Sequence, residues 1–332
     1  MNTADRGAAA GPRVTVLGGT GYLGRRIGEA FHADGARVHL VSRAPAQDGP
    51  ADVRHVAMDL LAADARDLAA LFGSLRPDVV VNAAGRVWQG DEAEMTAGNA
   101  DLVVRLTRAL AGLPHPPRLI QLGTVHEYGA GTPGAGTREE QQPAPVTPYG
   151  RSKLLGTRTV LRAAADDGLD GVVLRLANVI GAGVPAGSLF GRVAAHLGAA
   201  AVARSLGEHP DELRLPPLRA RRDLVDAHDA VDAVRAAATA PKADVGGRVI
   251  NVGRGEAVPM RALVDRMVRL SGVDVPVVEA APAPSPRTDV AWQQLDVSRA
   301  LRLLGWRPRR TLDDSLRDLL AAAVPAPVNG RT

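Results

Sequence analysis

Tyr149 and Lys153 are the two residues whose types and spacing point most directly to acid–base chemistry. Thr147 can cap a helix and Pro148 suits its first position, so the pair is predicted to lie on one helix face. An ammonium group about 4 Å from a phenol contributes roughly 4 kcal/mol at an effective dielectric constant of about 20, or about three pKa units. We therefore expect Lys153 to lower the pKa of Tyr149 toward neutrality, which would make Tyr149 a proton donor. The alternative is an exposed pair on a surface helix.

Thr124 is a second candidate for the same chemistry, because it follows a strand-like run, Arg118 to Leu122. Carboxyl ends of strands in doubly wound sheets face the ligand crevice, so the Thr124 hydroxyl could contact the same substrate oxygen as Tyr149. The alternative is a turn threonine bonded to its own backbone. His126 has no metal-ligand partner in register, and we predict that it lines the site or orients the substrate. No metal site is expected.

A glycine-rich segment near the N-terminus predicts a dinucleotide site. It lies between a β-branched run, Arg13 to Leu17, and a helical pattern that extends to about Ala33. Glycine permits a tight turn, allows backbone to approach a pyrophosphate and directs a helix N-terminus at its charge. The alternative is a purely structural glycine turn. The residues expected to bind the cofactor here are Gly18, Thr20, Gly21, Tyr22, Leu23 and Gly24.

The end of the second strand favours NADP, as NADPH, over NAD. The run Arg37 to Val41 is followed by Ser42 and Arg43, a hydroxyl and a guanidinium, where NAD enzymes carry a carboxylate for the ribose. Asp34 precedes this strand and Asp48 lies well into the following loop. The alternative for Arg43 is a solvated surface arginine. After the third strand, Asp59 is a candidate adenine contact, with a surface cap as the alternative.

Composition excludes several other mechanisms and partners. The 332 residues are 45% apolar and 23% charged, which is enough to bury a large core, and they include no Cys. Of the 40 basic residues, 38 are Arg, spread among acidic residues, so the net charge of +4 does not predict nucleic-acid binding. No apolar run approaches the roughly 20 residues of a membrane span, and no signal-peptide pattern is present. We expect a cytoplasmic protein with no membrane partner.

Alternating strands and helices predict an α/β fold, a doubly wound parallel sheet of the Rossmann type with a smaller C-terminal substrate-binding lobe. We predict a disordered lead over 1–12, a dinucleotide-binding domain over 13–177, and a lobe over 178–325 that is interleaved with the sheet. The segment from Gly129 to Pro148 is long and polar, which indicates a mobile loop near the site. The other strands are expected at Arg54 to Met58, Asp78 to Asn82, Gly171 to Leu176 and Arg248 to Val252.

Together, these motifs resemble the extended short-chain dehydrogenase/reductases, the branch that acts on nucleotide sugars. The resemblance runs from about Arg13 to Leu320. The segments that carry it are Gly18 to Gly24, Asn82-Ala83-Ala84-Gly85, Thr124 to Gly129, Tyr149-x-x-x-Lys153, Arg175 to Gly181 and Arg222 to Asp226. It implies cofactor contacts from Leu60, Ala83, Ala84, Gly85 and Lys153, and substrate contacts from Val125, His126, Asn178, Arg222 and Arg287. Asn178 and the two arginines would meet a diphosphate, for which the arginine fork is well suited.

Two departures from the family pattern narrow the predicted activity. Gly123 replaces the usual Ser, and Val125-His126 replace the Asp-Glu pair of sugar dehydratases, so dehydration is disfavoured. The segment resembles that of 4-ketoreductases of deoxysugar biosynthesis, which implies NADPH-dependent reduction of a TDP-linked 4-keto-6-deoxyhexose, as in antibiotic biosynthesis. The alternatives are an NAD-dependent nucleotide-sugar 4-epimerase and a non-catalytic dinucleotide sensor, although such sensors usually lack the Tyr and Lys pair. The sequence leaves the formation of a homodimer as an open alternative.

Overall fold

A seven-stranded parallel sheet organises the chain in the computed structural model, which describes residues 11–44, 53–86, 91–280 and 290–323. The strand order is β11-β6-β5-β4-β1-β2-β3, so the order reverses between β1 and β4, where such sheets open a ligand crevice. The bounds are β1 Arg13–Leu17, β2 Arg37–Ser42, β3 Arg54–Ala57, β4 Val79–Asn82, β5 Arg118–Thr124, β6 Gly171–Leu176 and β11 Arg248–Val252.

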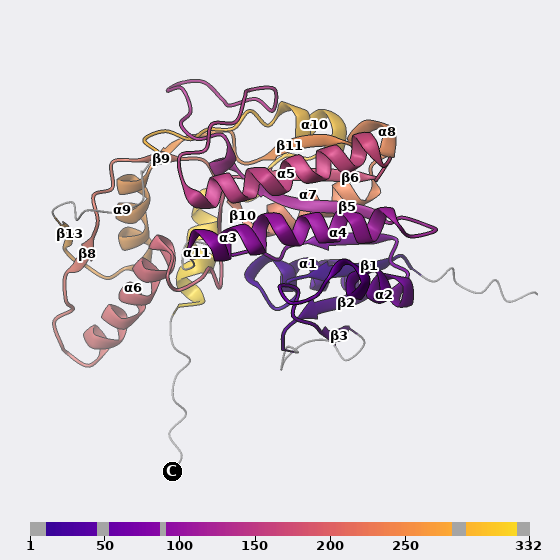
Figure 1. The fold of residues 1–332 in the computed structure, drawn as a ribbon. Helices are drawn as coiled ribbons and strands as arrows, with labels where there is room; N and C mark the ends of the chain where they lie inside the picture. The colour runs from indigo at the N-terminus through magenta and orange to yellow at the C-terminus, as the bar shows by residue number, and fades with distance from the viewer. Residues whose placement is uncertain (1–10, 45–52, 87–90, 281–289, 324–332) are drawn as a thin grey trace, which may run out of the picture.

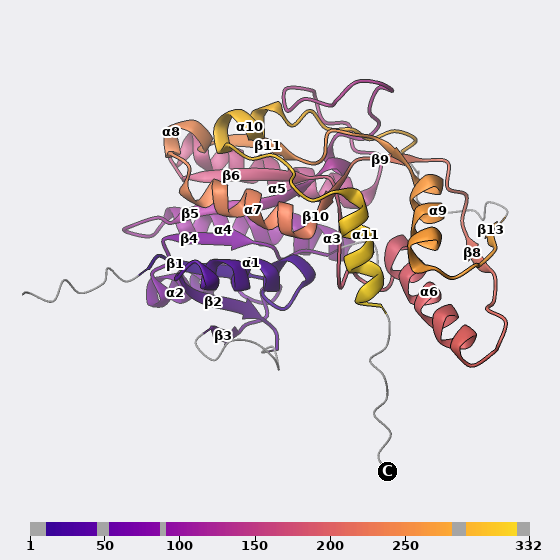
Figure 2. The same ribbon diagram turned by 180° about the vertical axis from the view of Figure 1, so that it is seen from behind.

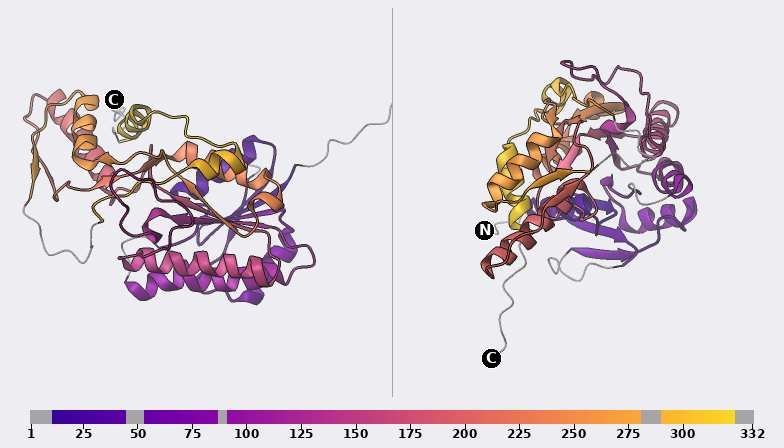
Figure 3. Two further views of the ribbon diagram at one scale, coloured as in Figure 1. Left: turned by 90° about the horizontal axis from the view of Figure 1, so that it is seen from above. Right: turned by 90° about the vertical axis from the view of Figure 1, so that its left-hand side faces the viewer.

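Helices cover both faces of this sheet. On one face lie α2 (Ala65–Leu75), α4 (Leu102–Ala111) and α5 (Pro148–Asp166), and on the other lie α1 (Tyr22–Ala33), α7 (Ala227–Thr239) and α10 (Ser298–Leu304) (Figures 1 and 2). Because both faces are covered, β4 and β6 are buried along their whole length. The left view of Figure 3 shows the sheet between its helical layers. The predicted doubly wound α/β fold is confirmed.

A separate apolar core lies at one end of the sheet, in the lobe at the left of Figure 1. It is built from α6 (Leu189–Ser205), α9 (Met260–Ser271) and α11 (Leu312–Ala321), with the strand pair β8 (Leu213–Leu215) and β13 (Val277–Glu279). Between these elements in sequence, α7 and β11 pack with the large sheet. The remaining short elements are α3 Glu92–Thr96, the π-helix η1 Ala97–Asp101, the 3₁₀-helix η2 Val125–Glu127, β7 Asn178–Ile180, β9 Arg221–Arg222, β10 Leu224–Asp226, α8 Lys242–Val245 and β12 Val258–Pro259.

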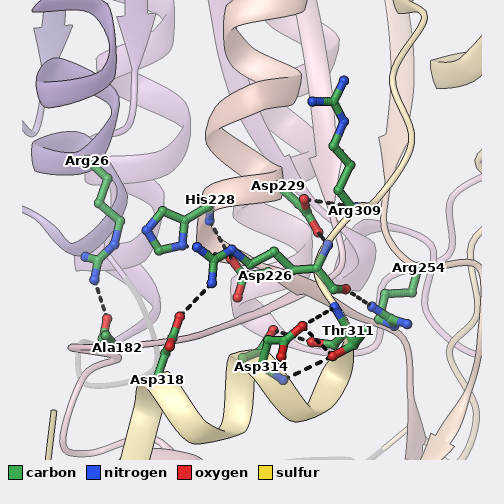
Figure 4. A network of polar contacts seen from close by, with 12 residues as sticks. Arg26, Ala182, Asp226, His228, Asp229, Arg254, Arg309, Thr311, Asp314 and Asp318 are labelled. Carbon is green, nitrogen blue, oxygen red and sulfur yellow. Dashed lines mark hydrogen bonds and ion pairs between the residues drawn. The ribbon is translucent and has the colours of Figure 1, made fainter. Parts of the chain in front are cut away.

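Polar contacts around Asp229 join the C-terminal segment to α7 (Figure 4). The Asp229 carboxylate accepts the backbone N–H groups of Arg309 and Arg310, both at 3.1 Å, and its carbonyl accepts Trp306 Nε1 at 2.9 Å. The Arg310 side chain pairs with Asp318 of α11 at 2.8 Å. Helix α11 of the lobe is therefore anchored to a helix of the sheet unit.

None of the helices in the described part of the chain is long and apolar enough to cross a membrane.

The segment from Gly129 to Pro148, predicted to be a mobile loop, forms hydrogen bonds with distant parts of the chain. The Thr137 N–H donates to the carbonyl of Gln294 at 2.8 Å, and the Thr137 carbonyl accepts the Asp296 N–H at 2.9 Å. Glu139 Oε1 accepts the backbone N–H of Asn251 in β11 at 2.9 Å. Local sequence patterns do not indicate these partners, because they lie far along the chain from the loop.

Candidate active site

The glycine turn after β1 forms a cradle that has no room for side chains. An added Cβ would lie 2.1 Å from the Gly18 carbonyl oxygen at Gly24, and 2.5 Å from Leu40 Cβ at Gly19. Gly18 itself has a φ of 76°, and a Cβ there would lie 2.8 Å from the Ala84 nitrogen. The turn, the first helix and the end of β4 are thus packed backbone against backbone, as a dinucleotide cradle requires.

The N-terminus of α1 points into this cradle without a side-chain cap. Gly21 is the N-cap residue, no side chain bonds to the first-turn N–H groups, and the first turn contains no acidic residue. Such a helix end is suited to a pyrophosphate. Thr20 is exposed here and Leu23 is half-buried. The chain's own residues therefore fit a dinucleotide.

Tyr22 does not direct its hydroxyl at solvent. The Arg26 guanidinium lies 4.6 Å from the centre of its ring, and burial raises the pKa of Tyr22 to about 12. A Cβ added to Gly181 would lie 3.4 Å from the Tyr22 hydroxyl and 3.6 Å from Asp226 Oδ2. The predicted contact of Tyr22 with the cofactor remains a prediction.

The carboxyl end of β2 presents Arg43 as an exposed side chain. Ser42 is buried, and its hydroxyl donates to the carbonyl of Ala44 at 2.6 Å. Asp34 is held away from this position, because both its carboxylate oxygens pair with Arg235 of α7. Asp48 lies outside the described residues. Among the residues named here, only Arg43 therefore presents an exposed charge at this position, and its contact with a 2′-phosphate remains a prediction.

The alternative role of Asp59 as a surface cap is present in the structure. Its Oδ1 accepts the N–H of Leu61 at 2.9 Å. The Leu60 side chain is buried in the core beside α2 and α4, which leaves only its backbone for a cofactor. The adenine contact of Asp59 and the cofactor contact of Leu60 remain predictions.

Asn99 is a site residue that sequence reasoning missed. Its side-chain oxygen accepts the Arg86 N–H at 3.0 Å, and its Nδ2 donates to the Arg86 carbonyl at 2.9 Å and to Ser152 Oγ at 3.0 Å. It thereby connects the turn of Ala83, Ala84 and Gly85 with the helix of Tyr149 and Lys153. Asn99 lies in the π-helix η1, a feature that occurs often at functional sites.

Thr124 ends β5 and contacts the predicted proton donor. Its hydroxyl forms a hydrogen bond with Tyr149 that lowers the Tyr149 pKa, although burial has the larger, opposite effect. The same hydroxyl accepts the His126 N–H in a long contact of 3.4 Å, so the turn-threonine alternative is also present. Thr147 caps α5 through the Gly150 N–H at 3.0 Å, which fixes the start of the helix that carries Tyr149. The structure thus brings Thr124 and Tyr149 together, and their shared contact with a substrate oxygen remains a prediction.

The prediction that Lys153 lowers the pKa of Tyr149 toward neutrality is wrong in this structure. Burial raises the pKa of Tyr149 to about 12, and the nearby Glu127 carboxylate adds to that rise. Lys153 is buried and donates to the Leu122 carbonyl at 2.5 Å instead. Burial lowers its own pKa, with Glu127 opposing this effect. Helical spacing places the two residues on one face but does not fix the direction of a lysine head group.

Three of the predicted substrate residues come together beside Tyr149. The His126 ring lies edge-on to the Tyr149 ring, with centroids 5.9 Å apart. The pKa of His126 is lowered to about 4, chiefly by burial and secondly by the Arg222 charge, while a hydrogen bond to Asn178 opposes both effects. His126 is therefore neutral at physiological pH, which suits a lining residue and not a general acid.

Arg222 is buried within β9, and its Nη1 donates to the carbonyls of Arg221, at 3.1 Å, and Val290. The acids proposed as its alternative partners are engaged elsewhere. Asp223 accepts the backbone N–H groups of residues 254, 255 and 295, and Asp226 accepts His228. Arg287 lies outside the described residues.

Val125 is only 2% exposed and packs into the main core. Its predicted contact with the substrate remains a prediction.

Together, the sheet, the glycine cradle at its switch point, and the Thr124–Tyr149 pair beside Lys153 define a nicotinamide-dinucleotide enzyme of the short-chain dehydrogenase/reductase type. Residues 14–253 match the model of the NAD dependent epimerase/dehydratase family. The chain belongs to this family, in its extended branch, and is an oxidoreductase or epimerase.

Individual proteins are also similar to the chain. It is 47% identical to dTDP-6-deoxy-L-talose 4-dehydrogenase (NAD(P)(+)) of Kitasatospora kifunensis over 320 residues, covering 95% of this chain and 97% of the relative. Its fold is similar to that of RMD from Pseudomonas aeruginosa complexed with NADPH, with a TM-score of 0.78, 22% identity and coverage of 94% and 99%. The UDP-glucose 4-epimerase of Thermus thermophilus, complexed with NAD, gives a TM-score of 0.80, 24% identity and coverage of 94% and 98%.

Proposed function

We propose that this protein reduces the C4 ketone of a nucleotide-linked 4-keto-6-deoxyhexose, with a TDP-linked sugar as the expected substrate and NADPH as the reductant. The observation that carries the proposal is the contact between Thr124 and Tyr149 beside the cluster of His126, Asn178 and Arg222. A proton donor thus adjoins a buried arginine that suits a diphosphate.

Each residue has a distinct role in this reaction. When bound, NADPH supplies the hydride for the carbonyl carbon. Thr124 and Tyr149 hold the carbonyl oxygen, and Tyr149 transfers its phenolic proton to that oxygen as the alcohol forms. A pKa of about 12 keeps this phenol protonated at neutral pH, as a proton donor requires. Lys153 is the residue that we expect to bind the cofactor ribose.

The talose 4-dehydrogenase supports this substrate class, because its name places oxidoreduction at C4 of a dTDP-linked 6-deoxyhexose. Its name also gives NAD(P)(+) as the cofactor. Our preference for NADPH therefore depends on Arg43, exposed at the end of β2, and on the pairing of Asp34 with Arg235.

The test is to incubate the purified protein with NADPH or NADH and a panel of TDP-4-keto-6-deoxyhexoses, following absorbance loss and identifying products by NMR. We expect NADPH consumption matched by formation of a C4 alcohol. A 4-epimerase would instead purify with tightly bound NAD and interconvert two alcohols without net consumption of cofactor. Consumption of neither cofactor with any of these sugars would refute the proposal.

A further inference from the structure

A buried carboxylate lies directly under the Thr124 turn. Glu127 is 0% exposed, and its Oε1 accepts the backbone N–H of Thr124 at 2.9 Å. Its Oε2 accepts Nε of Arg175 at 2.7 Å, and the Arg175 side chain is only 3% exposed. The Arg175 guanidinium in turn lies 4.4 Å from the centre of the Tyr128 ring. Glu127 is thus part of a buried network that also contains Arg175 and the Tyr128 ring.

Gly123 provides the space that this carboxylate occupies. A Cβ at position 123 would lie 2.7 Å from Glu127 Oε1, 3.1 Å from Val173 Cγ1 and 3.2 Å from Arg175 Cγ. All three atoms belong to buried side chains, so little could move aside. The absence of a side chain at Gly123 and the presence of an acid at Glu127 are therefore linked features of this chain.

Stability alone is a weak reason for such a pair, because a buried ion pair can often be replaced by apolar side chains without loss. Its position indicates another role. Glu127 fixes the backbone of Thr124, and its charge acts on both Tyr149 and Lys153: it raises the pKa of each residue, adding to the effect of burial on Tyr149 and opposing it on Lys153. The carboxylate thus favours the protonated form of both groups.

We propose that Glu127, lodged in the space left by Gly123 and paired with Arg175, is a positioning residue that holds the Thr124 hydroxyl against Tyr149 and places a negative charge near the Tyr149 phenol. This inference rests on the proposed function for its role in turnover. It concerns a residue that touches neither substrate nor cofactor and acts through Thr124 and Tyr149.

The main test is Glu127→Gln, which retains an acceptor for the Thr124 N–H and removes the charge. The alkaline limb of the kcat profile for reduction, where Tyr149 loses its proton, should move to lower pH by about one unit. The matched control is Glu139→Gln, because the Glu139 side chain is only 4% exposed, accepts a backbone N–H and lies beside an arginine, Arg299. That control should leave the limb in place. If the pH of the alkaline limb is unchanged in Glu127→Gln, the proposal is overturned, even if kcat falls.

Loss of Glu127 alone leaves Arg175 buried and unpaired, which can prevent folding. The double variant Glu127→Gln/Arg175→Gln removes both charges and keeps polar side chains of related shape. It should show a displacement of the alkaline limb in the same direction, because the Glu127 charge that acts on Tyr149 is removed in this variant too. A folded double variant with an unshifted limb equally overturns the proposal.

A titration without substrate separates this inference from the proposed function. Ultraviolet absorbance of phenolate, after subtraction of a Tyr149→Phe spectrum, reports the ionised fraction of Tyr149. At an alkaline pH where circular dichroism shows an intact fold, Glu127→Gln should contain several-fold more Tyr149 phenolate than the parent or Glu139→Gln. Equal fractions would refute the role of Glu127. A clear difference in a protein that reduces no 4-keto sugar would refute only the proposed substrate.

Discussion

Replacement of Arg222 by Ala should weaken binding of the sugar nucleotide without affecting the cofactor. Arg222 is 7% exposed and lies close enough to the half-buried His126 ring for its charge to lower the His126 pKa. A charge-assisted contact of this kind contributes about 1.5 to 3 kcal/mol. Its loss should raise KM by about 10- to 150-fold, since 1.4 kcal/mol corresponds to a factor of 10.

The assay combines initial rates with inhibition by TDP, which keeps the diphosphate and lacks the sugar. Both KM and the TDP inhibition constant should rise by a similar factor in Arg222→Ala, while NADPH affinity from isothermal titration stays unchanged. Arg221→Ala is the matched control, because Arg221 is the neighbouring strand residue and stacks 5.1 Å from the centre of the Trp292 ring. Successive side chains of a strand face opposite ways, so this control should leave TDP inhibition unaffected.

Thermal melts distinguish the structural alternative. Arg222 donates to the carbonyls of Arg221 and Val290, so some decrease in Tm is expected in any case. The inhibition constant is therefore the deciding quantity. A lower Tm with unchanged TDP inhibition would show that Arg222 is only a structural anchor, and the assignment of the diphosphate site would fail.

Three further predictions address the cofactor and the proton donor. Tyr149→Phe should lower kcat by about 10²- to 10⁴-fold and leave NADPH affinity unchanged in isothermal titration, and retention of most of kcat would remove Tyr149 from its role. Arg43→Ala should weaken NADPH far more than NADH, whereas equal losses would contradict the 2′-phosphate contact. Gly24→Ala should reduce NADPH affinity in fluorescence titration by at least about 10-fold, because its Cβ would lie 2.1 Å from a carbonyl oxygen. Gly73→Ala, with nothing within 4 Å of the added Cβ, is its control and should match the parent.

Most of the sheet could be predicted because strands buried on both faces appear as continuous runs of branched apolar residues. The runs at Arg13 to Leu17, Gly171 to Leu176 and Arg248 to Val252 match the observed strands at both ends. The fifth strand was predicted to end at Leu122 but continues to Thr124. This extension places the Thr124 hydroxyl at the end of the strand itself.

The parts of the site that escaped prediction depend on contacts between distant segments. Asn99 has no periodic pattern around it, and its importance lies in bonds to Arg86 and Ser152. The anchoring of the loop by Gln294 and Asn251 is equally invisible in local sequence. Likewise, Gly123 could be recognised as a departure from the family pattern, but its link to Glu127 requires the fold.

The error over Tyr149 and Lys153 bears on the direction of the chemistry. Helical spacing brought both residues to the site, but their pKa values are set by burial, which favours the neutral form of each group. A phenol that resists ionisation can give a proton to a developing alkoxide, whereas alcohol oxidation needs the phenolate as a base. A protonated phenol therefore suits the reduction that we propose. The reverse oxidation would need an ionised Tyr149, which a positive charge close to its hydroxyl would favour.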